Sequence, residues 1–166
     1  LIYGTICIIW IDGYTLVMMV GSSFLCGQCG VEIGVDALGT EHRNHCPMCL
    51  WSRHLDGEVP GDRESVCKGM MRPMGLVLKN GDGELMVVHK CMVCGHVSKN
   101  RVAGDDKPEV LLKLFEESMK LTAEDLLAMD SVGMKLLGED NKREVITQLY
   151  GKPYAEKYFA EAVKRE

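Results

Sequence analysis

The chain has 166 residues, of which 46% are hydrophobic and 26% are charged, and its formal net charge is -5. This composition is typical of a soluble globular protein with one domain or two small ones. It excludes a protein that attracts nucleic acid through its overall charge, so any nucleic-acid binding must depend on local groups of Arg and Lys.

The first segment, residues 1–20, is apolar, but Asp12 and Gly13 interrupt it. A membrane span needs about twenty uninterrupted apolar residues, so we expect no membrane anchor, and the segment lacks the pattern of a signal peptide. Met18 and Met19 stand just before Gly-Ser-Ser. One interpretation is that the natural start is one of these methionines, and that the leader 1–23 is a non-native upstream piece able to form an incidental strand or hairpin.

Cysteine dominates the next part of the chain. Three Cys-x-x-Cys pairs and one further cysteine occur between residues 26 and 94, namely Cys26/Cys29, Cys46/Cys49, Cys91/Cys94 and Cys67. Two residues between sulfurs let one tight turn direct both thiolates at a single tetrahedral metal. Seven is an odd number, which disfavours complete disulfide pairing. We therefore predict two zinc ions, a reducing, cytoplasmic location and no disulfide-linked partner.

The first zinc site is expected from two knuckles that face each other across a hairpin. Cys26 and Cys29 form the first knuckle, and Cys46 and Cys49 form the second. A short strand over 31–35, a turn over 36–40 and a segment over 41–45 connect them. This spacing is ordinary for a four-cysteine site.

The second zinc site has three predicted thiolate ligands, Cys67, Cys91 and Cys94. We favour His54 as the fourth ligand, because it precedes Cys67 much as the first knuckle precedes the second. The alternatives are His89, near the end of a strand predicted over 84–90, then His96, His45 and a water molecule. Water would leave an open position of the kind found in catalytic zinc sites.

After Lys107 there is no further cysteine, and apolar residues recur at helical spacing. The expected helices are one beginning at Pro108 with Leu111, Leu114, Phe115 and Met119 on one face, a second over 126–129 after a capping box at Thr122, a turn or two within 131–137, a third over 141–150, and a fourth from Pro153 to the end. We predict an α+β protein: a zinc-ribbon-like, β-rich domain with two metal sites over 24–107, then a short-helix bundle over 108–166.

Several longer strings resemble one known family. They are Phe24-Leu25-Cys26-Gly27-Gln28-Cys29, Arg43-Asn44-His45-Cys46-Pro47, Ser52-Arg53-His54-Leu55-Asp56, Pro60-Gly61-Asp62-Arg63, Asn100-Arg101 and Asp105-Asp106. Together they resemble the RNHCP-domain proteins, a bacterial family, over about residues 24–106. The resemblance implies zinc binding and the limits of a domain, and it implies no particular activity.

Two functions compete for the polar residues of these strings. In the first, the chain is a binding or adaptor module for RNA or an RNA-protein assembly. The arginines that would contact nucleic acid are Arg43, Arg53, Arg63 and Arg101, with Arg72 and Lys99 beside them. Trp51 and His54 would stack on a base, although Trp51 is also suited to the core. We favour this function. The sequence does not determine the oligomeric state.

In the second function, the chain is a metal-dependent hydrolase or nuclease that acts on phosphodiesters. His45 or His42 would be the general base, and Asp56, Asp62 or the Asp105/Asp106 pair would hold a further metal. Arg43 or Arg101 would bind phosphate. The same acids also suit ordinary roles, because Asp caps turns and helix starts.

Overall fold

The computed structural model describes residues 6–11, 14–19, 23–40 and 43–163. In the leader, strands β1 (Ile6–Ile11) and β2 (Tyr14–Met19) pair antiparallel as a hairpin. Their β-branched and aromatic residues favour extended backbone. None of the described helices has the length and apolar character needed to cross a bilayer.

A second small sheet carries the first knuckle. Strands β3 (Ser23–Leu25) and β4 (Glu32–Gly34) pair antiparallel on either side of it, and β4 lies within the strand predicted over 31–35. The predicted turn that follows is present, because the Thr40 amide donates to the Ala37 carbonyl at 3.3 Å. Of the segment predicted over 41–45, residues 41 and 42 lie outside the described residues, and His45 forms a single bridge with Ser52.

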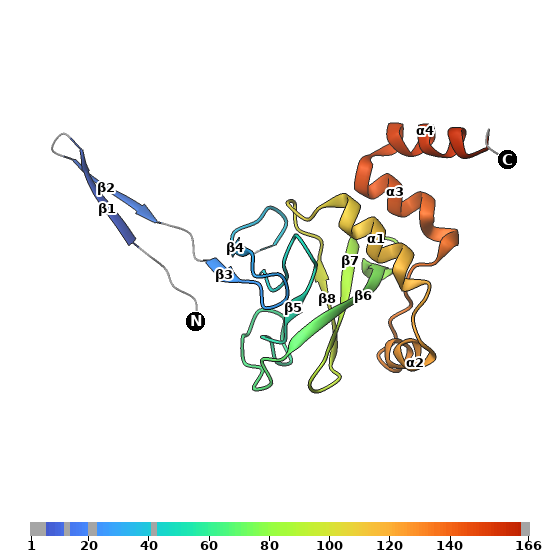
Figure 1. Cartoon of the computed structure of the whole chain (residues 1–166), viewed down its shortest axis with the longest axis horizontal. Coiled ribbons are helices and arrows are strands. Elements are labelled where there is room, and N and C mark those ends of the chain that lie inside the picture. Colours follow the sequence, from blue (N-terminus) through green and yellow to red (C-terminus); the bar gives the residue numbers. More distant parts are fainter. Residues whose placement is uncertain (1–5, 12–13, 20–22, 41–42, 164–166) are drawn as a thin grey trace.

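The centre of the molecule is a four-stranded antiparallel sheet (Figure 1). Its strands, in sheet order, are β5 (Ser52–Arg53), β6 (Met70–Leu78), β7 (Leu85–Cys91) and β8 (Val97–Arg101). Sequence patterns predicted β7 but not β6 or β8. Strand β6 contains Pro73 and Gly75, where its register with β7 shifts, and β8 is mostly polar. Both depend on hydrogen bonds to neighbouring strands more than on local preference.

Both faces of this sheet are buried. On one face, Leu76 and Val87 pack with Leu111 and Phe115 of helix α1 (Pro108–Ser118). On the other, a cluster that includes Val88 packs against Met129 of helix α2 (Ala123–Ser131) and other residues near it. The alternation of β7 side chains between the two clusters follows from the two-residue period of a strand.

Two further helices, α3 (Lys142–Tyr150) and α4 (Lys152–Val163), complete the chain. Helix α3 contacts α1, and α4 extends from α3 at the far end of the molecule (Figure 1). Gln148 of α3 accepts a hydrogen bond from the Leu85 amide at 2.9 Å and donates to the Gly83 carbonyl at 3.1 Å. These bonds hold α3 against the end of the β6–β7 hairpin.

The helix boundaries follow the local signals closely. Helix α1 begins at Pro108, and the Thr122 hydroxyl accepts a hydrogen bond from the Asp125 amide at 3.2 Å to cap α2. The sequence predicts one or two further helical turns within 131–137. This prediction is wrong for the residues after α2, because α2 ends at Ser131 and helical backbone resumes only at the short 3-10 helix η2 (Glu139–Asn141). Instead, the Leu137 amide donates to the Leu76 carbonyl of β6 at 2.8 Å. A second short 3-10 helix, η1 (Lys79–Gly81), joins β6 to β7.

Candidate metal centres

Each Cys-x-x-Cys pair is held in the same tight turn. The amide of the first cysteine donates to the carbonyl five residues later, and the amide four residues later donates back to that cysteine. The bonds are Cys26 N to Val31 O (2.9 Å) with Gly30 N to Cys26 O (2.9 Å), Cys46 N to Trp51 O (2.9 Å) with Leu50 N to Cys46 O (2.7 Å), and Cys91 N to His96 O (2.8 Å) with Gly95 N to Cys91 O (3.0 Å).

The fourth residue after the first cysteine has a positive φ in all three turns. It is 73° at Gly30, 60° at Leu50 and 76° at Gly95. Glycine adopts this backbone at little steric cost, whereas leucine does not. The Leu50 side chain is 1% exposed and belongs to the core on the α1 face, so its burial offsets the cost. The second knuckle is therefore attached to the core through its own turn.

The first cluster consists of Cys26, Cys29, Cys46 and Cys49, whose sulfur atoms all lie within 4.8 Å of one another. The sulfurs of Cys26 and Cys49 are 3.6 Å apart, as are those of Cys29 and Cys46. Sulfurs about 2.3 Å from a tetrahedral zinc ion lie about 3.8 Å from each other, whereas a disulfide bond is about 2.05 Å long. The four thiols therefore fit a metal ion.

The protein environment affects these thiols unequally. Burial raises the pKa of Cys46 and of Cys49. Burial acts in the same direction at Cys26, but the amides of Cys29 and Gln28 donate toward its sulfur and lower its pKa to about 7. Since thiolates are the form that ligates metal, a bound cation is what would favour deprotonation of the whole set.

The second cluster consists of His54, Cys67, Cys91 and Cys94, with one ligand atom from each within 4.8 Å of the others. The sulfurs of Cys67 and Cys91 are 3.7 Å apart, and His54 Nδ1 lies 3.3 Å from Cys94 Sγ. His54 directly follows β5, and its amide donates to the Gly69 carbonyl at 2.9 Å. This hydrogen bond places the histidine beside the third knuckle. Both clusters thus contain four protein ligands suited to zinc, and the rivals His45, His89 and His96 lie outside this set.

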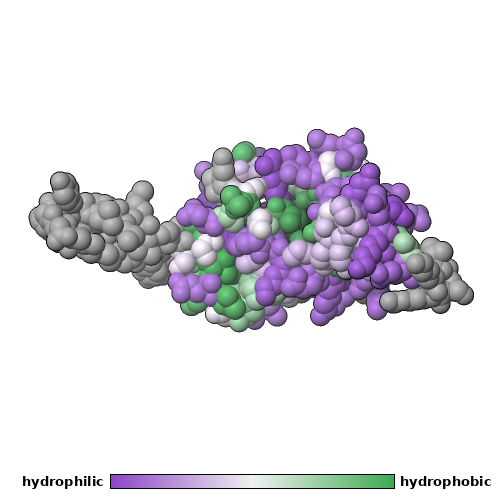
Figure 2. Space-filling model, turned by 90° about the horizontal axis from the view of Figure 1, so that it is seen from above, coloured by the Kyte–Doolittle hydropathy of each residue, from purple (hydrophilic) through white to green (hydrophobic). Residues whose placement is uncertain are grey.

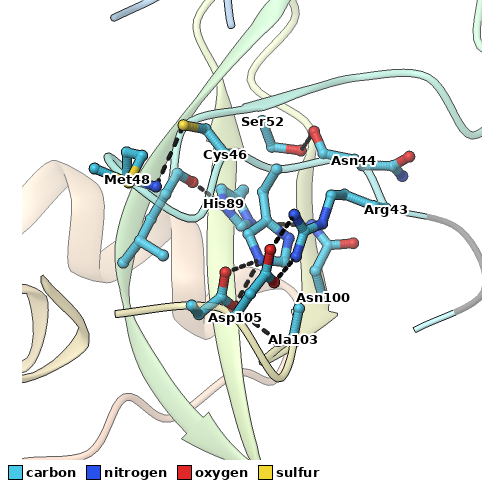
Figure 3. A network of polar contacts seen from close by, with 12 residues as sticks. Arg43, Asn44, Cys46, Met48, Ser52, His89, Asn100, Ala103 and Asp105 are labelled. Carbon is cyan, nitrogen blue, oxygen red and sulfur yellow. Dashed lines mark hydrogen bonds and ion pairs between the residues drawn. The ribbon is translucent and has the colours of Figure 1, made fainter. Parts of the chain in front are cut away.

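Arg43 and His45 are buried beside the second knuckle, and each pairs with one of two consecutive acids, Asp105 and Asp106, in the segment that connects β8 to α1. Arg43 donates through both terminal nitrogens to Asp105, one of them at 2.8 Å. His45 Nε2 lies 2.8 and 3.0 Å from the two carboxylate oxygens of Asp106. Figure 3 shows Asp105, from the segment that follows β8, pointing toward Arg43. The pairs tie residues about sixty positions apart in sequence to one another.

Asn44, between them, holds a different part of the chain. Its amide nitrogen donates to Asp56 at 2.8 Å, and its amide oxygen accepts a hydrogen bond from Arg63. The Ser52 hydroxyl donates to the Asn44 carbonyl at 2.8 Å. The Arg-Asn-His sequence therefore fastens the second knuckle both to the segment that connects β8 to α1 and to the loop over 56–63.

His89 connects the same knuckle to the central sheet. Its ring is fully buried, its Nε2 lies 2.7 Å from the Leu50 carbonyl, and its Nδ1 lies 3.1 Å from the Asn100 amide nitrogen (Figure 3). Burial, followed by the nearby His45, lowers the pKa of His89 to about 3. The ring is thus neutral, so Nε2 donates to Leu50 while Nδ1 accepts from Asn100.

These contacts change the list of accessible functional residues. The prediction that Arg43 contacts nucleic acid is wrong, because its side chain is 1% exposed and paired with Asp105. Arg63 is half-buried and bonded to Asn44, whereas Arg53 and Arg101 are exposed, with Arg101 3.2 Å from Glu84. Trp51 is half-buried.

The described catalytic candidates are each occupied by a hydrogen-bond partner within the protein. His45 is buried against Asp106, Asp56 accepts from Asn44, and Asp105 faces Arg43. Asp62 accepts hydrogen bonds from the amides of Gly57, Val59 and Glu64 at 2.6 to 3.0 Å, which stabilises its own turn. His42 lies outside the described residues. Each described candidate is thus engaged by a separate internal partner.

Sequence reasoning missed the structural roles of Leu50, His89 and Asn100. A signal for Leu50 was present, because alignment of the three knuckles places it where Gly30 and Gly95 stand. No comparable signal marked His89 or Asn100. Their bonds join separate segments, and sequence spacing within one segment cannot report them.

The chain was compared with known proteins and families. The comparisons with curated proteins and with solved structures gave no match. The family model described as the RNHCP domain matches residues 21–112, which include both clusters and the Arg-Asn-His sequence between the knuckles. This match spans more than half of the chain, and the chain therefore belongs to the RNHCP domain family.

Proposed function

We propose that the protein is a zinc-stabilised binding module that works in the reducing cytoplasm and binds single-stranded RNA or an RNA-protein assembly. The observation that carries the proposal is that each of the two clusters supplies four ligands from the protein. Four protein ligands are typical of structural zinc, whereas catalytic zinc keeps a position for water or substrate. Both ions would therefore hold the fold together.

The contacts of the Arg-Asn-His sequence, residues 43–45, which we call the signature, support binding rather than hydrolysis. Arg43 and His45, which a nuclease would need at its phosphate, each face a carboxylate of their own. A general base must reach the proton that it removes, and His45 is 1% exposed. The signature is thus better explained as a scaffold that positions the knuckles.

RNA is the partner that the exposed cations favour. Arg53 on β5 and Lys99 on β8 are exposed and line the same pocket, and Arg101 is exposed two residues after Lys99. Local cations of this kind attract the phosphate backbone even when the net charge is negative. Bases of single-stranded RNA remain free to contact rings and amides.

Elemental analysis combined with zinc-edge X-ray absorption tests the zinc part. We expect two zinc ions per chain, with a ligand shell of sulfur and a minor share of nitrogen. Less than one zinc ion per chain would contradict the proposal, and an oxygen ligand would favour the hydrolase alternative.

Fluorescence anisotropy with labelled single-stranded RNA tests the partner. We expect Arg53→Ala and Arg101→Ala to weaken binding and to reduce its salt dependence, and Lys135→Ala, which removes an exposed cation from the helical region, to leave it unchanged. Equal binding by all three variants and wild type would contradict the proposed face. Cleavage of the RNA by the zinc-loaded protein would replace binding with hydrolysis.

A further inference from the structure

A pocket of about 340 Å³ lies beside the second cluster. The segment from Arg53 to Pro60 forms one side, and His96 with residues of β8 forms another. Its volume is near the lower end of the range of about 300 to 1,000 Å³ for small-molecule sites, which suits a single small ligand. Neither the zinc ligation nor the pairing of the Arg-Asn-His sequence accounts for this space.

Two parallel rings line the pocket next to the metal cluster. The rings of His54 and His96 are stacked, with centroids 4.5 Å apart and planes 5° apart. His54 is held by its position 3.3 Å from Cys94, so the pair has a fixed orientation. His96 is exposed and available to a ligand. Flat rings of this kind are surfaces on which nucleic-acid bases stack.

The remaining lining is polar and carries both signs of charge. Arg53 and Lys99 supply cations, Asp56 and Glu58 supply carboxylates, and Ser98 and Asn100 supply hydrogen-bonding groups. An apolar ligand would leave these groups without partners, and a simple polyanion would face the two carboxylates. A nucleotide combines a flat base, hydrogen-bonding edges and an anionic phosphate, so it matches all three parts of the lining.

We propose that this pocket binds one ribonucleotide, with its base against the stacked His96 and His54 rings and its phosphate toward Lys99 and Arg53. The proposal rests on the proposed RNA-binding function and specifies where one unpaired nucleotide is held. A free nucleotide carries the same chemistry, so the two sources are separated by experiment.

The zinc-loaded full chain is titrated with AMP, GMP, CMP and UMP, and with labelled single-stranded RNA. Nuclear magnetic resonance follows the amides of Ser98 and Asn100, and anisotropy follows the RNA. We expect His96→Ala, which removes no ligand of either cluster, to weaken binding about tenfold, in keeping with the loss of one stacked base. Lys99→Ala should weaken binding and lower its salt dependence, while Lys120→Ala is the matched control at an exposed cation outside the pocket.

The outcomes separate this proposal from the function on which it rests. If His96→Ala holds two zinc ions and binds RNA and mononucleotides as wild type does, the pocket proposal is overturned while RNA binding stands. If mononucleotides shift the pocket amides but RNA does not bind, the pocket stands with a free nucleotide as its ligand, and the RNA partner is overturned. Absence of both interactions overturns both proposals.

Discussion

The Asp106 carboxylate holds the second knuckle to the segment that connects β8 to α1, and its replacement tests whether the Arg-Asn-His sequence acts as a scaffold. Its side chain has no exposed surface and accepts two kinds of hydrogen bond, from His45 Nε2 and from the Ala103 amide at 2.7 Å. In the structure Oδ2 already serves both donors, while Oδ1 lies 3.0 Å from His45 Nε2. Asp106→Asn keeps the shape, but it removes the charge and puts an amide N–H group in place of the Oδ1 acceptor that faces His45.

The expected cost follows from these contacts. Loss of one buried hydrogen bond to a charged group costs about 2 kcal/mol. For a chain of this size, each kcal/mol lowers the melting temperature by about 2 to 4 °C, so Asp106→Asn should melt about 4 to 8 °C below wild type. Zinc content should remain unchanged, because Asp106 belongs to neither cluster.

Thermal unfolding of the zinc-loaded proteins, followed by circular dichroism, measures this difference. Asp36→Asn is the matched control, since Asp36 is exposed on a turn. A melting temperature for Asp106→Asn within about 1 °C of the control would refute the scaffold role, because the buried charge and the second oxygen acceptor facing His45 cannot be lost without cost. Loss of zinc in Asp106→Asn would also contradict it, by showing that the acid acts on the cluster.

Three further predictions concern α2, the second cluster and the metal. Burial raises the pKa of Asp125, but the opposed β-strand cations Arg72 and Lys90, 2.8 and 3.0 Å away, lower it by more, so it lies below its ordinary value of 3.8. The Asp125 carboxylate therefore stabilises the fold at pH values above 3.8, and this contribution is lost as the pH falls below that value. Asp125→Asn should lower the free energy of unfolding by about 2 kcal/mol in denaturant unfolding at pH 7. An unchanged free energy of unfolding would contradict the pairing. Gly69→Ala should reduce zinc from two ions toward one by elemental analysis, because a Cβ there would lie 2.9 Å from Cys91 Sγ, whereas Gly138→Ala, with open space around it, should keep both. Chelation of zinc should abolish cooperative unfolding, and addition of zinc should restore it. Structural zinc contributes about 10 kcal/mol or more of binding free energy, which is comparable with the whole stability of a domain. A chelated chain that still unfolds cooperatively would argue against structural zinc.

The surface of the molecule is mostly hydrophilic on the face seen in Figure 2, and apolar residues gather toward the end away from the carboxyl-terminal helices. The knuckle-bearing part of the chain exposes Leu25, Leu38, Val66 and Val93 at 68, 84, 99 and 73%. Small metal-stabilised domains bury a smaller fraction of their apolar surface than larger domains do, because metal binding supplies part of the folding free energy that a hydrophobic core supplies in larger domains.

Local sequence was sufficient for the features that depend on neighbouring residues. The Cys-x-x-Cys spacing predicted the three knuckles, since a tight turn involves only a few consecutive residues. Pro108, Thr122 and Gly151 marked helix boundaries within about two residues, because caps act within a single turn. The preference for His54 also relied on spacing, and the fold brings His54 to the three remaining cysteines.

Other features depend on the packing of distant segments. Strands β6 and β8 carry weak local signals and are held by their pairing with β7. Arg43 has the sequence features of a phosphate-binding residue, yet its side chain is 1% exposed and is paired with Asp105, which is far away in sequence and remains half exposed. Spacing reports which groups a turn brings together, whereas burial and ion pairing depend on every segment that packs around a residue. For this protein the geometry of each Cys-x-x-Cys turn follows from spacing, whereas the assembly of four ligands in each cluster and the burial of Arg43 and His45 follow from packing.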